Sequence, residues 1–207
     1  MNEMLKNTLK LTLITLLAGA LLGLVYMVTK EPIAYQEARL RREAFQAVYP
    51  TATTFTEVPA PDATKIKKTL AAADLSDHVF NELVLAQDTA GQTIGYVVTM
   101  TSKSGYGGDI RLSLGVDREG RLQKLYLLSI SETAGLGMRA KEDEFLNQYI
   151  GQTGPLDVQR HTGQTGAGYI DAISGATITS RAVTRAVNAG LLIPPLLDQN
   201  EKGGTTP

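Results

Sequence analysis

The chain has 207 residues, of which 43% are hydrophobic, and its formal net charge is −1. This length is enough for one sizeable core with additional segments, and the near-neutral charge provides no basic footprint for nucleic acid. Cysteine is absent and the only histidines are His78 and His161, which excludes disulfides, cysteine-bound iron–sulfur clusters and c-type haem and argues against a histidine-rich metal site. Redox chemistry in this chain would therefore require an organic cofactor.

An uncharged apolar run lies near the N-terminus, between two lysines. It covers residues 11–29, which at about 1.5 Å per residue extend roughly 28 Å, the hydrocarbon thickness of a bilayer. Tyr26 suits an interfacial position. A cleaved signal peptide is the alternative, because Lys6 and Lys10 resemble its basic n-region. The run is long for a signal peptide and no small-x-small cleavage site follows it, so we predict a single transmembrane helix and an N-terminal membrane anchor over residues 1–30.

Residues 31–76 are predicted to form a helical and irregular connecting region. Apolar residues recur at helical spacing after Pro32, which predicts a helix over residues 33–49. Its basic residues are expected on a solvated face, with contact to lipid headgroups as the alternative; they are Arg39, Arg41 and Arg42. Residues 50–76, which are rich in proline, threonine and alanine, indicate a spacer or a small subdomain with a short helix.

Residues 77–195 are predicted to form one α+β domain, an antiparallel sheet flanked by helices. Two segment pairs with alternating aliphatic residues each flank a glycine-containing turn, and they predict two hairpins, residues 82–86 with 94–100 and 110–116 with 122–128. Together they predict a sheet of about four strands. Residues 138–150 have the spacing of a helix, residues 151–169 have the composition of a surface loop, and residues 196–207 are expected to be a disordered tail.

Two glycine-rich segments interrupt this pattern. Gly-Tyr-Gly-Gly occupies residues 105–108, between the hairpins, and Glu-Thr-Ala-Gly-Leu-Gly occupies residues 132–137, after the second hairpin. Taken alone, the first is a flexible link and the second an ordinary turn before a helix. Their glycines would also allow the backbone to approach a flat ring closely.

The most informative stretch is residues 171–180, Asp-Ala-Ile-Ser-Gly-Ala-Thr-Ile-Thr-Ser, which leads into an amphipathic run. A turn therefore becomes a helix N-terminus here, where unpaired N–H groups and the helix dipole stabilise an anion such as phosphate. The simpler interpretation is that one hydroxyl caps the helix. A cap needs only one hydroxyl, whereas this stretch supplies four, from Ser174, Thr177, Thr179 and Ser180.

The pattern Asp-x-x-Ser-Gly-Ala-Thr-x-Thr over residues 171–179 resembles the flavinylation motif of FMN-binding domains. Such domains occur in the G subunit of the Rnf electron transport complex and in the C subunit of the sodium-translocating NADH:quinone reductase. In that family, the threonine of Ser-Gly-Ala-Thr carries FMN through a phosphodiester that a flavin transferase makes from FAD. The resemblance implies Thr177 as the attachment site and implies a surrounding FMN-binding set of Asp171, Ser174, Gly175, Ala176, Thr179 and Ser180.

Both glycine-rich segments extend the resemblance, so it covers three motifs across residues 105–190. It implies that Tyr106 lies against the flavin ring. It also implies a loop beside the cofactor made by Glu132, Thr133, Gly135, Leu136 and Gly137, in which Ala134 stands where the family has proline. The chain length favours the Rnf G subunit over the longer C subunit of the reductase.

The resemblance further implies a membrane-anchored electron carrier in a complex that moves electrons between ferredoxin and NAD and pumps ions. Its partners would be the other Rnf subunits, a flavin transferase during maturation, and the lipid bilayer. The charges flanking the apolar run do not decide the topology. The resemblance implies a cytoplasmic N-terminus, with the main domain on the periplasmic or extracellular side of the cytoplasmic membrane.

Three alternatives remain at this point. The first is a C-type subunit of the sodium-translocating reductase. The second is a non-redox, membrane-anchored interaction module in which residues 171–180 only cap a helix. The third is a hydrolase with Ser174 or Thr177 as its nucleophile, which is disfavoured because neither histidine has the setting of a catalytic triad.

Overall fold

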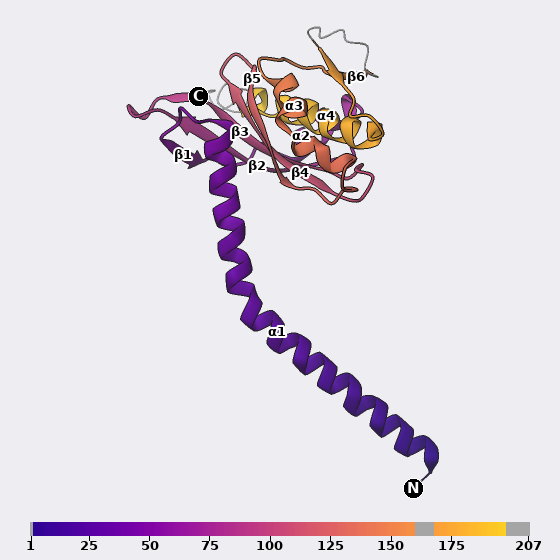
Figure 1. The fold of residues 1–207 in the computed structure, drawn as a ribbon. Helices are drawn as coiled ribbons and strands as arrows, with labels where there is room; N and C mark the ends of the chain where they lie inside the picture. The colour runs from indigo at the N-terminus through magenta and orange to yellow at the C-terminus, as the bar shows by residue number, and fades with distance from the viewer. Residues whose placement is uncertain (1, 160–167, 198–207) are drawn as a thin grey trace. The chain divides into compact units, whose positions relative to one another are not determined.

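The computed structural model describes residues 2–159 and 168–197 (Figure 1). The chain divides into two compact units, residues 1–42 and residues 43–207. One long helix, α1 (Glu3–Val48), covers the first unit from Glu3 onward and contributes its last six residues to the second.

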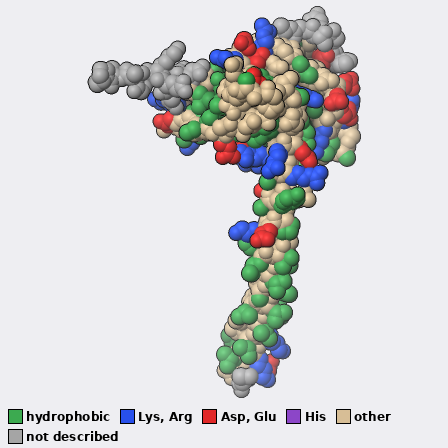
Figure 2. Space-filling view, turned by 90° about the vertical axis from the view of Figure 1, so that its left-hand side faces the viewer, with side chains coloured by type: hydrophobic (Ala, Val, Ile, Leu, Met, Phe, Trp, Pro, Cys, Tyr) green, Lys and Arg blue, Asp and Glu red, His purple; other side chains and the backbone are tan. Residues whose placement is uncertain are grey.

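Helix α1 joins the predicted anchor and the predicted helix over residues 33–49 into one element. It continues through Pro32, whose ring nitrogen cannot donate the usual helical hydrogen bond. An 18-residue window of α1 has a mean hydropathy of 2.3, and none of that window is buried. Hydrophobic side chains accordingly line the surface of the helix (Figure 2). By length and composition, α1 is able to span a membrane.

The second unit contains a five-stranded antiparallel sheet, which confirms the predicted α+β class with its antiparallel sheet. The strands are β1 (Thr54–Glu57), β2 (His78–Gln87), β3 (Thr93–Ser102), β4 (Ile110–Asp117) and β5 (Leu122–Ser129), and they follow one another in chain order. The two predicted hairpins are β2–β3 and β4–β5. Strand β1, from the segment predicted as a spacer or a small subdomain, is an additional strand that pairs with β2 at the edge of the sheet.

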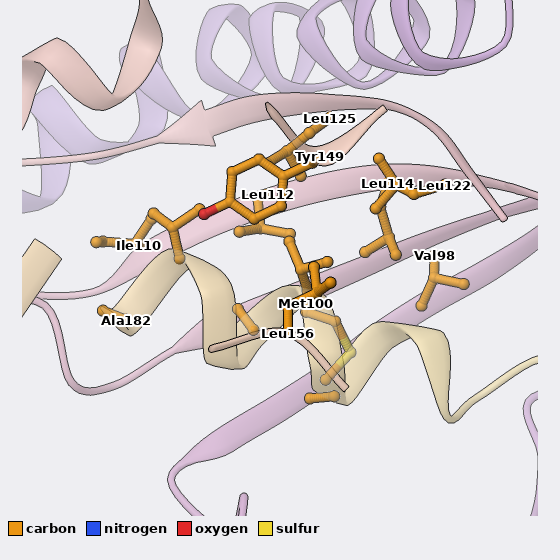
Figure 3. Close-up of a cluster of buried hydrophobic side chains, with 14 of the residues drawn as sticks. Val98, Met100, Ile110, Leu112, Leu114, Leu122, Leu125, Tyr149, Leu156 and Ala182 are labelled. Carbon is orange, nitrogen blue, oxygen red and sulfur yellow. The ribbon is translucent and has the colours of Figure 1, made fainter. Parts of the chain in front are cut away.

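One face of the sheet carries the main core. Helix α4 (Thr177–Leu191) packs against β3 and β4, and α2 (Ala63–Ala72) adds Ile66 and Leu70 to the same cluster. Tyr149 lies fully buried among aliphatic side chains (Figure 3). Its hydroxyl is 2.7 Å from the Thr184 hydroxyl of α4, so a polar link crosses this core.

The last turns of α1 cover the opposite face of the sheet. Phe45 and Val48 pack there with Val84 and Val97, whereas Val98, the next residue along β3, points into the main core. This division follows from the alternation of side chains along a strand. Residues 43–76 supply this cover and also form strand β1 and helix α2. They therefore belong to the second compact unit rather than to a separate connector.

The predicted helix over residues 138–150 is replaced by three short pieces. These are a 3-10 helix η1 (Gly137–Lys141), the single-turn helix α3 (Asp143–Leu146) and a 3-10 helix η2 (Asn147–Tyr149). The break falls at Glu142, whose φ of −73° and ψ of 142° are extended rather than helical. The apolar spacing does identify buried residues, since Phe145 and Tyr149 lie in the core, but it does not guarantee a continuous helix.

A small parallel pair, β6 (Asp157–Gln159) and β7 (Tyr169–Asp171), lies within and after the predicted surface loop. Residues 160–167 of that loop lie outside the described part of the chain. The same holds for residues 198–207 of the predicted tail. Leu196, which falls within the predicted tail, is instead buried and belongs to the main core.

Candidate functional site

The stretch predicted to carry the chemistry forms a tight turn directly before α4. The Ala176 N–H donates to the Ile173 carbonyl over 2.9 Å, and Gly175 in the third position has a φ of +74°. A left-handed third residue is the requirement of a type II turn, and glycine meets it without steric cost. The ends of the turn, Ile173 and Ala176, are buried, whereas Ser174 and Gly175 between them are exposed.

Helix α4 begins without a side-chain cap. Its N-cap residue is Ala176, and within the part of the chain that the structure describes no side chain accepts a hydrogen bond from the first helical N–H groups. Helix α2 differs, because Asp62 caps it by accepting from the Thr64 N–H over 2.7 Å. The capping interpretation of the motif hydroxyls therefore does not describe α4. Its free N–H groups are instead available to an external anion.

The four hydroxyls of the motif differ in exposure. Thr177 is partly exposed and Ser174 is exposed. Thr179 and Ser180 are 1% and 0% exposed, so their side chains face the protein interior. The Ser180 hydroxyl accepts from the Ile173 N–H over 3.0 Å and donates to the Ala176 carbonyl over 2.9 Å. Of the two threonines, only Thr177 is partly exposed to solvent.

The loop of residues 132–137 lies against the motif. A methyl group on Gly137 would lie 2.8 Å from Thr179 Oγ1, so only glycine allows the backbone of this loop to approach α4 so closely. On the same loop, the Leu136 Cδ2 atom would lie 3.0 Å from a Cβ on Gly175. The Leu136 side chain therefore sits over the turn, and it is 43% exposed.

The Gly-Tyr-Gly-Gly segment joins the same region through Glu132. One oxygen of the Glu132 carboxylate accepts from the Tyr106 N–H over 2.9 Å. The Tyr106 ring points outward and is 70% exposed, and Ile178, directly after Thr177, is 54% exposed. The three motifs thus converge on one surface, where apolar side chains are available to a flat aromatic ring.

A cavity of about 420 Å³ opens beside the turn, and four residues of the stretch 171–180 line it, namely Asp171, Ala172, Ile173 and Ser174. Arg139 lines it and forms an ion pair with Glu142 over 3.1 Å. The buried Oδ1 atom of Asp171 has no hydrogen-bond partner among the described residues. A larger cavity, about 790 Å³, runs along α4 from Arg181 to Leu191, and none of residues 171–180 line it.

Side-chain amides fix the segment that leads into the motif. Gln148 accepts from the Asp171 N–H over 2.7 Å and donates to the Asp171 carbonyl over 3.4 Å, in place of a neighbouring strand. Asn188 of α4 makes the same pair of bonds with Leu156, each 2.8 Å long. Three side chains of this region were not predicted, because no local pattern distinguishes them from others on a polar surface; they are Gln148, Asn188 and Arg139.

A charged cluster lies farther along α4. Arg185 pairs with Asp77 over 3.4 Å, and the Asp77 carboxylate lies 2.8 Å from His78 Nδ1. Burial lowers the pKa of His78 below its ordinary value and outweighs the opposing effect of the Asp77 carboxylate. This cluster joins the start of β2 to α4, and it includes no motif residue.

Comparison with known proteins gives two family matches. Residues 105–192 match the FMN-binding domain, and residues 1–48 match the RnfG N-terminal region. The first range contains all three motifs, and the second coincides with α1.

Curated relatives match along nearly the whole chain. The G subunit of the Na(+)-translocating ferredoxin:NAD(+) oxidoreductase complex of Acetobacterium woodii is 32% identical over 192 residues, covering 91% of this chain and 90% of the relative. The proton-translocating counterpart of Clostridium ljungdahlii is 30% identical over 187 residues, with 90% and 89% coverage. The G subunit of the ion-translocating oxidoreductase complex of Yersinia pestis is 31% identical over 196 residues, with 91% and 90% coverage.

Two solved structures share the fold. NqrC of Shewanella oneidensis has a TM-score of 0.54 at 16% identity and covers 82% of this chain and 99% of its own. The C subunit of the Na(+)-translocating NADH-quinone reductase of Parabacteroides distasonis has a TM-score of 0.53 at 20% identity, with 75% and 89% coverage. At these identities the likeness to the C subunits shows the fold alone, whereas the sequence relatives are G subunits. The chain therefore belongs to the family of Rnf complex G subunits and contains an FMN-binding domain.

Proposed function

We propose that this protein is a membrane-anchored electron carrier of an ion-translocating ferredoxin:NAD oxidoreductase complex, with FMN bound covalently to Thr177. The observation that supports it best is the turn before α4. It combines a partly exposed threonine with an uncapped helix N-terminus, next to exposed apolar side chains. The family supports the same function, since relatives carry that complex in their names.

The residues present fit a flavin phosphate. A phosphodiester on Thr177 would retain one negative charge directly at the free N–H groups of α4, where the helix dipole stabilises it. Ser174, Gly175 and Ala176 would complete the cradle around this phosphate. Bound FMN supplies reversible electron transfer, and the chain holds it in position and sets its surroundings.

The attachment reaction belongs to a flavin transferase acting on this chain. The Thr177 hydroxyl oxygen forms a bond to the FMN-side phosphorus of FAD, and the bond from that phosphorus to the bridging oxygen breaks. AMP leaves with that oxygen, and the hydroxyl proton passes to a base. A threonine hydroxyl is a weak nucleophile at neutral pH, so the transferase must supply this activation.

The apolar side chains beside Thr177 are proposed to hold the isoalloxazine ring. Leu136 and Tyr106 offer one aliphatic and one aromatic surface, and both are exposed. Glu132, Thr133, Gly135 and Gly137 form the loop that carries Leu136. The Glu132 carboxylate accepts from the Tyr106 N–H and so links this loop to the main chain of the segment that carries Tyr106.

The N-terminal part of α1 is proposed to anchor the protein in the cytoplasmic membrane. Residues 1–30 would cross the bilayer from a cytoplasmic N-terminus, and the FMN-binding domain would lie on the periplasmic or extracellular side. The unburied, apolar surface of α1 supports this anchor. The partners are then the lipid bilayer, the other Rnf subunits and the flavin transferase.

Intact mass measured after coexpression with a flavin transferase tests the covalent attachment. The wild-type chain is expected to gain one FMN phosphodiester, Thr177→Ser to remain modifiable, and Thr177→Ala to stay unmodified and colourless. Thr179→Ala is the matched control, because the Thr179 hydroxyl is buried. This control is expected to retain the flavin. A wild-type chain at its unmodified mass, or peptide mapping that places the flavin on Thr179, contradicts the proposal.

A further inference from the structure

We infer that Ser180 is a positioning residue for flavin attachment, holding the turn Ile173–Ala176 in the form that presents Thr177 to the transferase. The inference rests on the proposed function, because it names the residue that prepares the attachment site. Ser180 itself does not touch the incoming flavin. Its side chain is 0% exposed and lies on the inner side of α4.

The Ser180 hydroxyl connects both ends of the turn. It accepts from the Ile173 N–H over 3.0 Å and donates to the Ala176 carbonyl over 2.9 Å. A hydroxyl is able to do both at once because it has one donor and two acceptor sites. The turn's own bond, from the Ala176 N–H to the Ile173 carbonyl, joins the same two residues over 2.9 Å. Two separate links therefore close one four-residue turn.

The helix itself does not require this hydroxyl. The Ser180 N–H already makes the regular helical bond to the Ala176 carbonyl over 3.0 Å. Serine inside a helix is also less favourable than alanine, because its side chain competes for the backbone. A serine at position 180 is therefore better explained by the hydrogen bond that its hydroxyl accepts from the main-chain N–H of the buried residue Ile173.

Closure of the turn determines where Thr177 points. Ile173 and Ala176 are 7% and 6% exposed, so the two ends are fixed in the core while Ser174 and Gly175 remain outside. Thr177 follows Ala176 directly, and the carbonyl of Ala176 is the group that Ser180 holds. Without the hydroxyl, the Ile173 N–H loses its partner, and the turn opens for part of the time. A transferase that binds only the closed turn then needs a higher concentration of this chain to reach the same rate.

The test measures flavin transfer to the full-length chain, purified without flavin in detergent and supplied with FAD and a flavin transferase. Initial rates of FMN incorporation are followed by intact mass at increasing concentrations of the chain. Ser180→Ala is expected to raise the KM for the chain about tenfold, with kcat changed by less than about twofold, because at saturating concentrations of the chain every transferase molecule still binds a closed turn. The flavin still maps to Thr177.

Ser113→Ala is the matched control. Ser113 is also 0% exposed, and it pairs with the Thr99 hydroxyl over 2.8 Å within the sheet. The substitution therefore removes an equally buried hydroxyl without touching the turn. It is expected to leave the KM for the chain within about twofold of wild type, even where thermal unfolding shifts. An equal rise in KM for both variants, or no rise for Ser180→Ala, overturns the inference.

Amide hydrogen exchange provides a readout that does not depend on the flavin. The Ile173 amide is expected to exchange faster in Ser180→Ala than in wild type and to be unchanged in Ser113→Ala. Unchanged exchange at Ile173 in Ser180→Ala overturns the inference by itself. A wild-type chain that accepts no flavin contradicts the proposed function instead, so the two failures are distinguished.

Discussion

Among single residues, burial separates hydroxyl groups that are equivalent in the sequence. Thr177 and Thr179 both belong to the motif, yet Thr177 is partly exposed and Thr179 is 1% exposed. A reagent from outside reaches the first and not the second. The assignment of Thr177 as the attachment residue stays a prediction, and its exposure is the physical reason to prefer it.

Gly175 is expected to be required both for stability and for the site. Its φ of +74° is unfavourable for alanine by about 1–2 kcal/mol. A Cβ there would also lie 3.0 Å from Leu136 Cδ2. Gly120 has a similar φ of +80° with nothing within 4 Å of a Cβ, so Gly120→Ala measures the backbone cost alone. Thermal unfolding should show Gly175→Ala as the less stable variant, and only this variant should lose flavin incorporation. Equal effects of the two substitutions would exclude a role for the Leu136 contact.

His78 is expected to make the stability of the domain dependent on pH. Burial lowers its pKa in the folded state, whereas the unfolded chain has an ordinary histidine pKa near 6.5. Below this pH the unfolded state binds more protons than the folded state, so the free energy of unfolding decreases as the pH falls from 7 to 5. Denaturant titrations of wild type and His78→Gln should show a weaker pH dependence in the variant. An identical slope in both would mean that His78 is not the titrating group.

At the scale of elements, side-chain amides replace missing strand neighbours around β6 and β7. These strands have three residues each, which is too few for a stable pair in isolation. Gln148 binds the main chain of Asp171 at the end of β7, and Asn188 binds the main chain of Leu156 before β6. Gln148 of η2 thus holds the start of the motif, and Asn188 of α4 holds the segment that enters β6.

Gln148→Ala is expected to lower the free energy of unfolding by about 1–2 kcal/mol, because two hydrogen bonds to the Asp171 main chain are lost. The control is Gln123→Ala, which removes an exposed amide bonded to the Asp117 carboxylate over 2.9 Å. Its effect should stay below about 0.5 kcal/mol. Chemical denaturation measures both values. A loss for Gln148→Ala no greater than the control would show that the bonds from Gln148 to Asp171 do not stabilise β7.

For the whole molecule, the end of α1 belongs to the domain while its N-terminal part does not. Phe45 and Val48 are 5% and 0% exposed in the cluster that covers one face of the sheet. In contrast, none of the 18-residue apolar window of α1 is buried. A cut between residues 42 and 43 therefore separates the proposed membrane anchor from the folded unit.

Two truncated chains test this boundary. Residues 43–207 are expected in the aqueous fraction after ultracentrifugation, whereas the full chain sediments with membranes. Residues 49–207 lack Phe45 and Val48 and should be less stable by about 3 kcal/mol or more, the usual cost of losing a buried aromatic side chain. Thermal unfolding compares the two. Membrane retention of residues 43–207 would contradict the anchor, and equal melting temperatures would contradict the packing role of Phe45 and Val48.

The sequence alone determined the features whose signals are local. The apolar run of residues 11–29, the alternation in the two hairpins and the motif at residues 171–179 each depend on neighbours a few positions apart. Hydrophobic periodicity and turn chemistry act at this range, so they are visible without a structure. The class of the fold followed from this periodicity, whereas the family was implied by the resemblance of the motif and of both glycine-rich segments to FMN-binding domains.

Features that depend on contacts between distant segments became visible only in the folded chain. Periodicity alone did not reveal the break at Glu142, the pairing of β1 with β2, or the packing of Phe45 beneath the sheet. It also did not show that Ser180 faces inward to close the turn, while Leu136, from a loop almost forty residues earlier, lies over Gly175. A spacing pattern states which residues share a face, but the partner that covers this face is chosen by the whole fold.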